Sequence, residues 1–258
     1  MHRFPLIFGH YFKRAVKHPI NLLVYICLPL ALIALNTIGM VGLFEMQGSD
    51  LATNTDAVAM QTTFLAVMFM ISFQFFSGEL LLENMYNDLK EGSVRWRLLA
   101  SPVPQRTFLS GIALSSWIYN IAQALVIFGV TAIAFDVRWG NPLVFVIVLL
   151  LVSVLSQLIA ALITQLAPKR KTASVAINIL CFGMMFLSGM LFVPLGDSAI
   201  ATFLQQYGTP LALGYRAILY AGPVLDNMAQ AWTNIGILAA ITAVMAVVVL
   251  ALGRRRRA

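Results

Sequence analysis

Six long apolar runs, almost free of charge, constrain this chain more than any other feature of its sequence. About 20 predominantly apolar residues are enough for a helix to cross a bilayer, and the runs lack the alternation that a membrane β-barrel requires. Only 10% of the 258 residues are charged, whereas soluble domains carry about 25%. We therefore predict an all-α, polytopic membrane protein with six transmembrane helices, in a single domain over residues 1–258. The predicted spans are Ile20–Leu43, Ala57–Leu82, Phe108–Phe135, Leu143–Leu166, Thr172–Val193 and Ala231–Leu252.

The lysines and arginines indicate how these spans are oriented. They lie before the first span, between the second and third, between the fourth and fifth, and after the sixth; the exceptions are Arg138 and Arg216. Cytoplasmic loops of membrane proteins collect lysine and arginine. We therefore predict that all four clusters and both termini are cytoplasmic.

Residues 3–18 are too short and too charged to form a span. On a helical projection the basic side chains fall on one side, and most of the opposite side carries Phe4, Ile7, Phe8, Tyr11, Phe12 and Ala15. A basic, aromatic-rich amphipathic helix of this kind lies in the headgroup plane of a membrane. The alternative is an ordinary helix that packs on protein.

A second irregular segment, residues 194–226, separates the fifth and sixth predicted spans. Its apolar pieces Ala199–Leu204 and Leu211–Leu219 are too short to cross a bilayer and are interrupted by glycine and proline. Irregular backbone at membrane depth must be covered by protein or line a cavity. We predict a re-entrant pair of short helices on the external side; the alternative is a surface loop with two amphipathic helices.

The third irregular segment, Glu83–Arg106, is predicted to be a cytoplasmic loop. Its first part is compatible with a helix, Gly92 is a break, and Trp96, Leu98 and Leu99 offer apolar contacts on a short amphipathic helix. Pro102 and Pro104 cannot continue a helix and hold the exit extended. This pattern favours an element that docks into another protein over a helix that lies on lipid headgroups through its arginines.

The motifs of catalysis are not found in the sequence. There is no HExxH, no GxSxG and no phosphate-binding GxxxxGK[ST] motif. The histidines His2, His10 and His18 do not share a helix face, so a metal site is not expected. The span interiors carry almost no ionisable residues, which ion-driven transporters usually need. We therefore expect a non-enzymatic chain without a cofactor of its own, which takes its energy from outside.

Taken together, the order of these parts resembles the permease of an ATP-binding-cassette exporter of the second exporter class, a family that includes drug- and antibiotic-export permeases and polysaccharide and lipid exporters. The resemblance covers essentially the whole chain. It rests most on the loop between the second and third spans, and also on Leu187–Pro194, Pro210 and Arg216. The matching loop residues are Glu83, Glu91, Gly92, Leu98, Leu99, Ala100, Ser101, Pro102, Val103, Arg106, Phe108, Leu109 and Gly111.

The resemblance implies that Glu83–Arg106 is a coupling element that docks into a separate ATPase subunit. It implies two permease copies, most simply a homodimer, two ATPase copies that bind ATP and Mg²⁺, and outward transport across a bacterial cytoplasmic membrane. Apolar anchors carry most of the energy of an interface, so Trp96, Leu98 and Leu99 would fill a groove of the ATPase. The implied coupling residues are Glu83, Asp88, Glu91, Gly92, Arg95, Trp96, Arg97, Leu98, Leu99, Pro102 and Arg106.

Polar and soft side chains inside the spans are candidates for a substrate pathway. Polar residues of transmembrane helices usually face the bundle, and methionine-rich surfaces suit varied apolar ligands. The candidates are Asn120, Gln123, Gln157, Asn178, Met184, Met185 and Phe186. The alternatives are contacts between helices for the amides and simple packing for the methionines.

An uncharged pathway favours a hydrophobic or amphipathic substrate over a sugar polymer. Three other functions stay open from the sequence: export of a lipid-linked polysaccharide, a self-sufficient channel or ion-coupled carrier, and a membrane scaffold that transports nothing.

Overall fold

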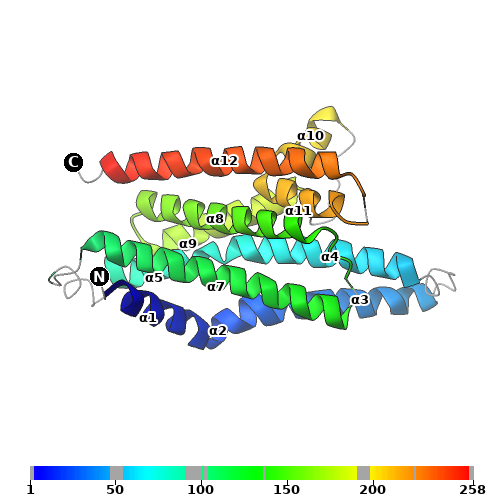
Figure 1. Ribbon diagram of the computed structural model, residues 1–258, viewed down its shortest axis with the longest axis horizontal. Helices are drawn as coiled ribbons and strands as arrows, with labels where there is room; N and C mark the ends of the chain where they lie inside the picture. Colours follow the sequence, from blue (N-terminus) through cyan, green and yellow to red (C-terminus); the bar gives the residue numbers. More distant parts are fainter. Residues whose placement is uncertain are drawn as a thin grey trace.

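The computed structural model describes residues 3–46, 55–90, 100, 104–135, 137–190, 198–223 and 225–255. Within these residues every regular element is a helix, and six helical segments are long and apolar enough to cross a membrane. The prediction of an all-α protein with six spans is confirmed. The helices run roughly along one long axis, with the labelled N- and C-termini at the same end (Figure 1).

The N-terminal helix α1 (Arg3–Lys17) packs lengthwise against the start of α7 (Gln105–Ala134). Gly111 permits this close approach, because a Cβ atom there would lie 2.7 Å from Cγ2 of Ile7. Tyr11 and Ala15 are buried. Much of the apolar face that was predicted to enter the membrane is thus covered by protein, and the location of α1 at the membrane surface stays a prediction.

The first span, Pro19–Gly39, contains a short α2 (Pro19–Leu22), a π-helical turn η1 (Leu23–Cys27) and most of α3 (Leu28–Met46). The π-helical turn lies just before Pro29, which has no N–H to donate to the carbonyl four residues earlier. A local change of helical hydrogen bonding at this point is the usual accommodation.

The second span is longer than predicted. It consists of α4 (Thr55–Phe76), α5 (Gly78–Met85) and a π-helical turn η3 (Tyr86–Lys90), and together they form a candidate span over Val58–Lys90. The helix thus continues through the first eight residues of the segment predicted as a loop. These elements lie at the centre of the bundle, where α4 and α5 between them contact α3, α7, α8, α9 and α11.

The remaining spans are α7, α8 (Pro142–Leu166), α9 (Arg170–Leu187) and α12 (Met228–Arg255). The start of α8 is fixed by its sequence, because the Asn141 side chain accepts a hydrogen bond from the Leu143 backbone N–H at 2.9 Å and Pro142 occupies the first helical position.

Two short helices, α10 (Ala199–Tyr207) and α11 (Pro210–Tyr220), follow α9. Both lie at the end of the molecule away from the termini (Figure 1). Whereas α10 exposes Ile200 and Phe203, α11 is buried against α4, α8 and α12. Gly214 sits close to Val152 of α8. The two short helices are present as predicted, and their external, re-entrant location stays a prediction.

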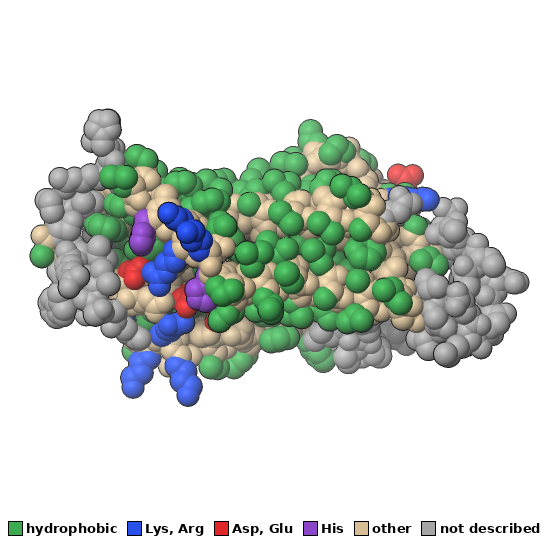
Figure 2. Space-filling view, turned by 90° about the horizontal axis from the view of Figure 1, so that it is seen from below, with side chains coloured by type: hydrophobic (Ala, Val, Ile, Leu, Met, Phe, Trp, Pro, Cys, Tyr) green, Lys and Arg blue, Asp and Glu red, His purple; other side chains and the backbone are tan. Residues whose placement is uncertain are grey.

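Charge and apolar surface are separated along the long axis. Seen from the side on which α1, α2 and α3 lie, charged and histidine side chains gather at one end, and a broad band of hydrophobic side chains follows (Figure 2). Exposed members of this kind include Leu35 and Ile38 of α3 and Ile133 of α7. A broad band of exposed apolar side chains next to a polar end is expected for a bilayer-spanning surface.

Candidate coupling site and substrate pathway

The structure describes half of the predicted coupling segment Glu83–Arg106, including its first eight residues, which continue the helix of the second span. Glu83 lies in α5 and Asp88 lies in η3. Arg106 lies in the first turn of α7, and its side chain is outside what the structure describes. The other predicted coupling residues lie outside the described residues, and these are Glu91, Gly92, Arg95, Trp96, Arg97, Leu98, Leu99 and Pro102.

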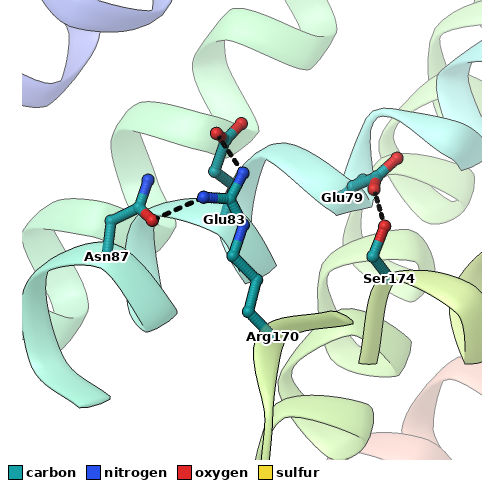
Figure 3. A network of polar contacts seen from close by, with 5 residues as sticks. All are labelled: Glu79, Glu83, Asn87, Arg170 and Ser174. Atoms are coloured by element: carbon teal, nitrogen blue, oxygen red, sulfur yellow. Dashed lines mark hydrogen bonds and ion pairs between the residues drawn. The ribbon is translucent and has the colours of Figure 1, made fainter. Parts of the chain in front are cut away.

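One face of the α5–η3 helix binds the start of α9. The Arg170 guanidinium donates to Glu83 Oε1 at 2.7 Å and to Asn87 Oδ1 at 2.8 Å, and Ser174 donates to the Glu79 carboxylate. Figure 3 shows this network. The three acceptors are spaced four residues apart and therefore share a helix face. The carboxylates also compensate a cation at the N-terminus of α9, where the helix dipole disfavours positive charge.

A second face of the same helix binds α1. Arg14 Nη1 lies 2.9 Å from Asp88 Oδ2, and only 12% of the Asp88 side chain is exposed. Tyr11 is buried beside this pair, and burial, followed by the negative charge of Asp88, raises the pKa of Tyr11 well above its ordinary value. Tyr11 therefore stays neutral at physiological pH.

The last turn of this helix binds the end of α8. Lys90 Nζ donates to the backbone carbonyls of Thr164 and Ala167, the latter at 3.1 Å, and the Tyr86 hydroxyl donates to Ala167 O at 2.7 Å. The Lys90 ammonium also lies 4.6 Å from the centre of the Tyr86 ring. The last carbonyls of a helix have no partner within it, and a cation is favourable there. Lys90 thus caps α8.

These contacts attach the segment Gly78–Lys90 to α1, α8 and α9. It contains the first eight residues of the predicted coupling element Glu83–Arg106 and leads directly to residue 91. Any displacement passed back from that element must therefore either move these three helices with it or break the contacts.

The predicted pathway residues of α7 are buried between helices. Asn120 and Gln123 are 0% and 1% exposed, and Asn120 Nδ2 donates to Gln74 O at 3.2 Å. Gln74 Nε2 in turn donates to Leu149 O at 2.8 Å and to Ser153 Oγ at 2.6 Å. Asn120 therefore joins α7 to α4, which is the helix-to-helix role left open by the sequence. A pathway role for these residues stays a prediction.

The other pathway candidates lie in two places. Gln157 of α8 is buried at the wall of a cavity formed with α5 and α7. Asn178, Met184, Met185 and Phe186 belong to α9, where Met185 is buried and Phe186 is 40% exposed. The structure thus places Asn120 and Gln123 together on α7, Gln157 on α8 and the remaining four residues on α9. A pathway role for all seven residues stays a prediction.

Sequence reasoning missed several residues that fasten the α5–η3 helix. In the sequence Arg14, Lys90 and Arg170 indicate only topology, whereas in the structure each of them binds across elements. The four-residue spacing of Glu79, Glu83 and Asn87 was a usable signal for a polar face. The sequence alone does not identify the residues that bind that face.

Comparison with known families decides the class of this protein. Residues 45–251 match the family model described as ABC-2 family transporter protein. The chain belongs to the ABC-2 transporter family. No curated protein matches the chain. The match begins within α3 and ends within α12.

Membership settles the coarse function. The protein is a multi-pass membrane protein and the permease subunit of an ABC exporter, in a family whose non-catalytic membrane subunits pair with a separate ATP-binding-cassette ATPase.

Proposed function

We propose that this permease exports hydrophobic or amphipathic compounds, such as drugs, antibiotics or lipid-like molecules, outward across a bacterial cytoplasmic membrane. It acts as a homodimer with two ATPase subunits, which bind ATP and Mg²⁺ and dock on the segment Glu83–Arg106. Both termini are cytoplasmic in this arrangement.

The observation that carries the proposal is the attachment of Gly78–Lys90 to three helices. A docking element transmits work only if its base is fixed to the parts that must move. Here the base is fixed by Glu83 to α9, by Asp88 to α1 and by Lys90 to α8. The substrate class is supported by the predicted pathway residues, because none of them carries a charge.

The test is ATP-driven accumulation of the amphiphilic dye rhodamine 6G in inside-out proteoliposomes that contain the permease and its ATPase. The double variant Trp96→Ala with Pro102→Gly should insert normally but lose coupling, so that ATP hydrolysis no longer drives dye uptake. The variant Glu83→Gln with Arg170→Gln should keep ATPase binding and reduce dye transported per ATP by up to about two-fold, because the base is then held less firmly on the α9 side.

Lys169→Gln is the matched control, since Lys169 is exposed next to Arg170 and precedes the same helix. It should leave transport per ATP unchanged. Dye flux through the permease without ATPase would support a self-sufficient carrier and overturn the proposal. Undiminished co-purification and coupling in the Trp96/Pro102 variant would overturn the docking role of the loop.

A further inference from the structure

Glu79 is the one Asp, Glu, Lys, Arg or His residue within the six spans predicted from the sequence. In the structure it lies in the first turn of α5, inside the candidate span Val58–Lys90. Its contact Ser174 follows Arg170 by four residues, so the carboxylate lies about one helical turn, or about 6 Å, deeper in the bundle than the start of α9. Ionisable side chains within spans are costly and mark substrate or ion pathways. Glu79 is therefore a candidate binding residue.

The negative charge of Glu79 is not compensated by a neighbouring cation. Its carboxylate accepts a hydrogen bond from the neutral hydroxyl of Ser174. Arg170, one turn away on α9, is held by Glu83 and Asn87 instead (Figure 3). In the described part of the chain no lysine or arginine forms an ion pair with Glu79. A positive charge supplied from outside the chain would therefore be bound favourably at this point.

α9 brings an amide and an aromatic ring to the same place. Ser174, Asn178 and Phe182 are spaced four residues apart and share one face of α9. Phe182 packs edge-on against Phe76, with ring centres 5.2 Å apart, and Phe76 precedes Glu79 by three residues. Asn178 lies between these contacts along α9, and its side chain forms no hydrogen bond with another described residue. We name these five residues the α9 seam.

The α9 seam is open at the surface of the chain. Phe182 is 56% exposed, and Glu79 and Asn178 are half-buried. Among the six spans of the described residues, α9 has the lowest mean hydropathy and is nevertheless one of the least buried. Polar groups that face lipid alone are unfavourable. The open face of α9 is thus better suited to a ligand that carries a polar group than to acyl chains.

A carboxylate flanked by aromatic rings is a combination that recognises organic cations. We propose that the α9 seam binds the cationic end of an amphipathic substrate. Glu79 pairs with the positive charge, Asn178 bonds to a polar group beside it, and the rings of Phe76 and Phe182 contact the apolar part. The inference rests on the proposed export function and narrows its substrate class to amphipathic cations.

The test measures binding to the purified full-length permease in dodecyl maltoside, without the ATPase. The probe is the cationic dye rhodamine 6G, followed by fluorescence anisotropy. Tetraphenylphosphonium, a lipophilic cation, should displace the dye. The neutral compound triphenylphosphine oxide should displace it only at concentrations at least about ten-fold higher, because it has no charge for Glu79 to bind.

Substitutions at Glu79 separate its charge from its packing. Glu79→Gln keeps an acceptor for the Ser174 hydroxyl and should weaken binding of both cations about ten-fold, since a hydrogen bond to a charged group is lost. Binding of triphenylphosphine oxide should stay the same. Glu79→Asp keeps the charge and should keep the preference for the cation. Asn178→Leu should weaken dye binding a few-fold, which is the effect of one neutral hydrogen bond.

Asp226→Asn is the matched control for loss of one negative charge. Asp226 is exposed in the connection between α11 and α12, and asparagine tolerates its positive φ of 41°. This variant should bind rhodamine 6G as the unmodified permease does. An equal loss in Asp226→Asn and Glu79→Gln would mean that the net charge of the protein attracts the dye, and would overturn the proposal.

Three further results would overturn the site: no binding of rhodamine 6G to the unmodified permease, unchanged affinity in Glu79→Gln, or equal displacement by the neutral oxide. Failure of the site and failure of the export function are distinguishable. ATP-driven dye uptake that is undiminished in Glu79→Gln would leave export standing and overturn the site. Cation binding that depends on Glu79, together with no ATP-driven uptake, would leave the site standing and overturn export.

Discussion

In the sequence the second and sixth spans are both long apolar helices. In the fold, however, the second is buried among other helices and the sixth is largely exposed on the surface of the chain. In the most apolar window of the second span, Val58–Lys90, 78% of the residues are buried within this chain, compared with 17% for Met228–Gly253. The sixth span has the higher mean hydropathy of the two. The more polar helix is therefore the central one.

The physical reason lies in what each helix contacts. A polar side chain that faces lipid can bond only to its own helix, whereas one that faces other helices also finds their backbone carbonyls and hydroxyls. The second span carries Ser72, Gln74 and Ser77, all buried and hydrogen-bonded. The sixth exposes Val244, Val247 and Leu250. Hydropathy alone does not sort the spans, because α8 is as hydropathic as α12 and is mostly buried.

The sharpest test of this comparison is a single methyl group placed in each helix. Gly78→Ala puts a Cβ atom 2.5 Å from Ser156 Oγ and 2.7 Å from the Ser156 carbonyl oxygen. Because the obstacle includes backbone, α5 and α8 must separate, and we expect a loss of about 2–3 kcal/mol in the free energy of unfolding. The measurement is reversible unfolding in detergent followed by circular dichroism.

Gly236→Ala in α12 is the matched control. A Cβ atom at this position meets nothing within 4 Å, and alanine favours a helix over glycine by up to about 1 kcal/mol. We expect unchanged or slightly increased stability. Equal losses at the two positions would show that the sixth span is packed as tightly as the second, and would contradict the comparison.

The spans were predictable because hydropathy over 20 residues is a property of the local sequence. The predicted Leu143–Leu166 is observed as Pro142–Leu166, and Phe108–Phe135 as Thr107–Ala134. The short apolar pieces on either side of Gly208 became α10 and α11 for the same reason.

The end of the second span was not predictable from local sequence. The sequence predicts a cytoplasmic loop from Glu83 onward, with a first part compatible with a helix, and several polar groups of that part bind partners contributed by distant elements. Asp88 pairs with Arg14, 74 residues away, and Glu83 with Arg170, 87 residues away. These partners make a charged helix acceptable at the base of the bundle. The spacing on the helix was visible in the sequence, but the identity of its partners depends on how the bundle packs.

Loss of the hydrogen bonds between central helices should lower the free energy of unfolding less than loss of the close packing at Gly78 does. Gln74→Leu removes the donors to Leu149 O and Ser153 Oγ, and we expect a loss of about 1 kcal/mol, since hydrogen bonds between membrane helices average about 0.6 kcal/mol each. Thr242→Val in α12 removes only a bond to Leu238 O of the same helix and should cost less than about 0.5 kcal/mol. The same detergent unfolding assay measures both variants. A larger loss of unfolding free energy for Thr242→Val than for Gln74→Leu would contradict the assignment of the second span as the central helix.

The smallest contributions to the free energy of unfolding are expected from the two ion pairs at the base of the central helix. The coupling energies of the two pairs should differ from each other. In the first pair Arg14 is 38% and Asp88 12% exposed, whereas in the second Arg170 is 45% and Glu83 34% exposed, so the pairs differ mainly in the burial of the carboxylate. Solvent and salt screen exposed pairs, which contribute between about 0 and 1 kcal/mol. Double-mutant cycles with Arg14→Gln and Asp88→Asn should therefore give a coupling energy of up to about 1 kcal/mol, with the smaller salt dependence of the two pairs. Cycles with Arg170→Gln and Glu83→Gln should give less than about 0.5 kcal/mol at low salt and still less at 0.5 M NaCl, which shortens the Debye length to about 4 Å.

If the α9 pair instead proved the stronger, the helix would be held from the α9 side, and α1 would have to be regarded as a cover on the bundle without a mechanical role.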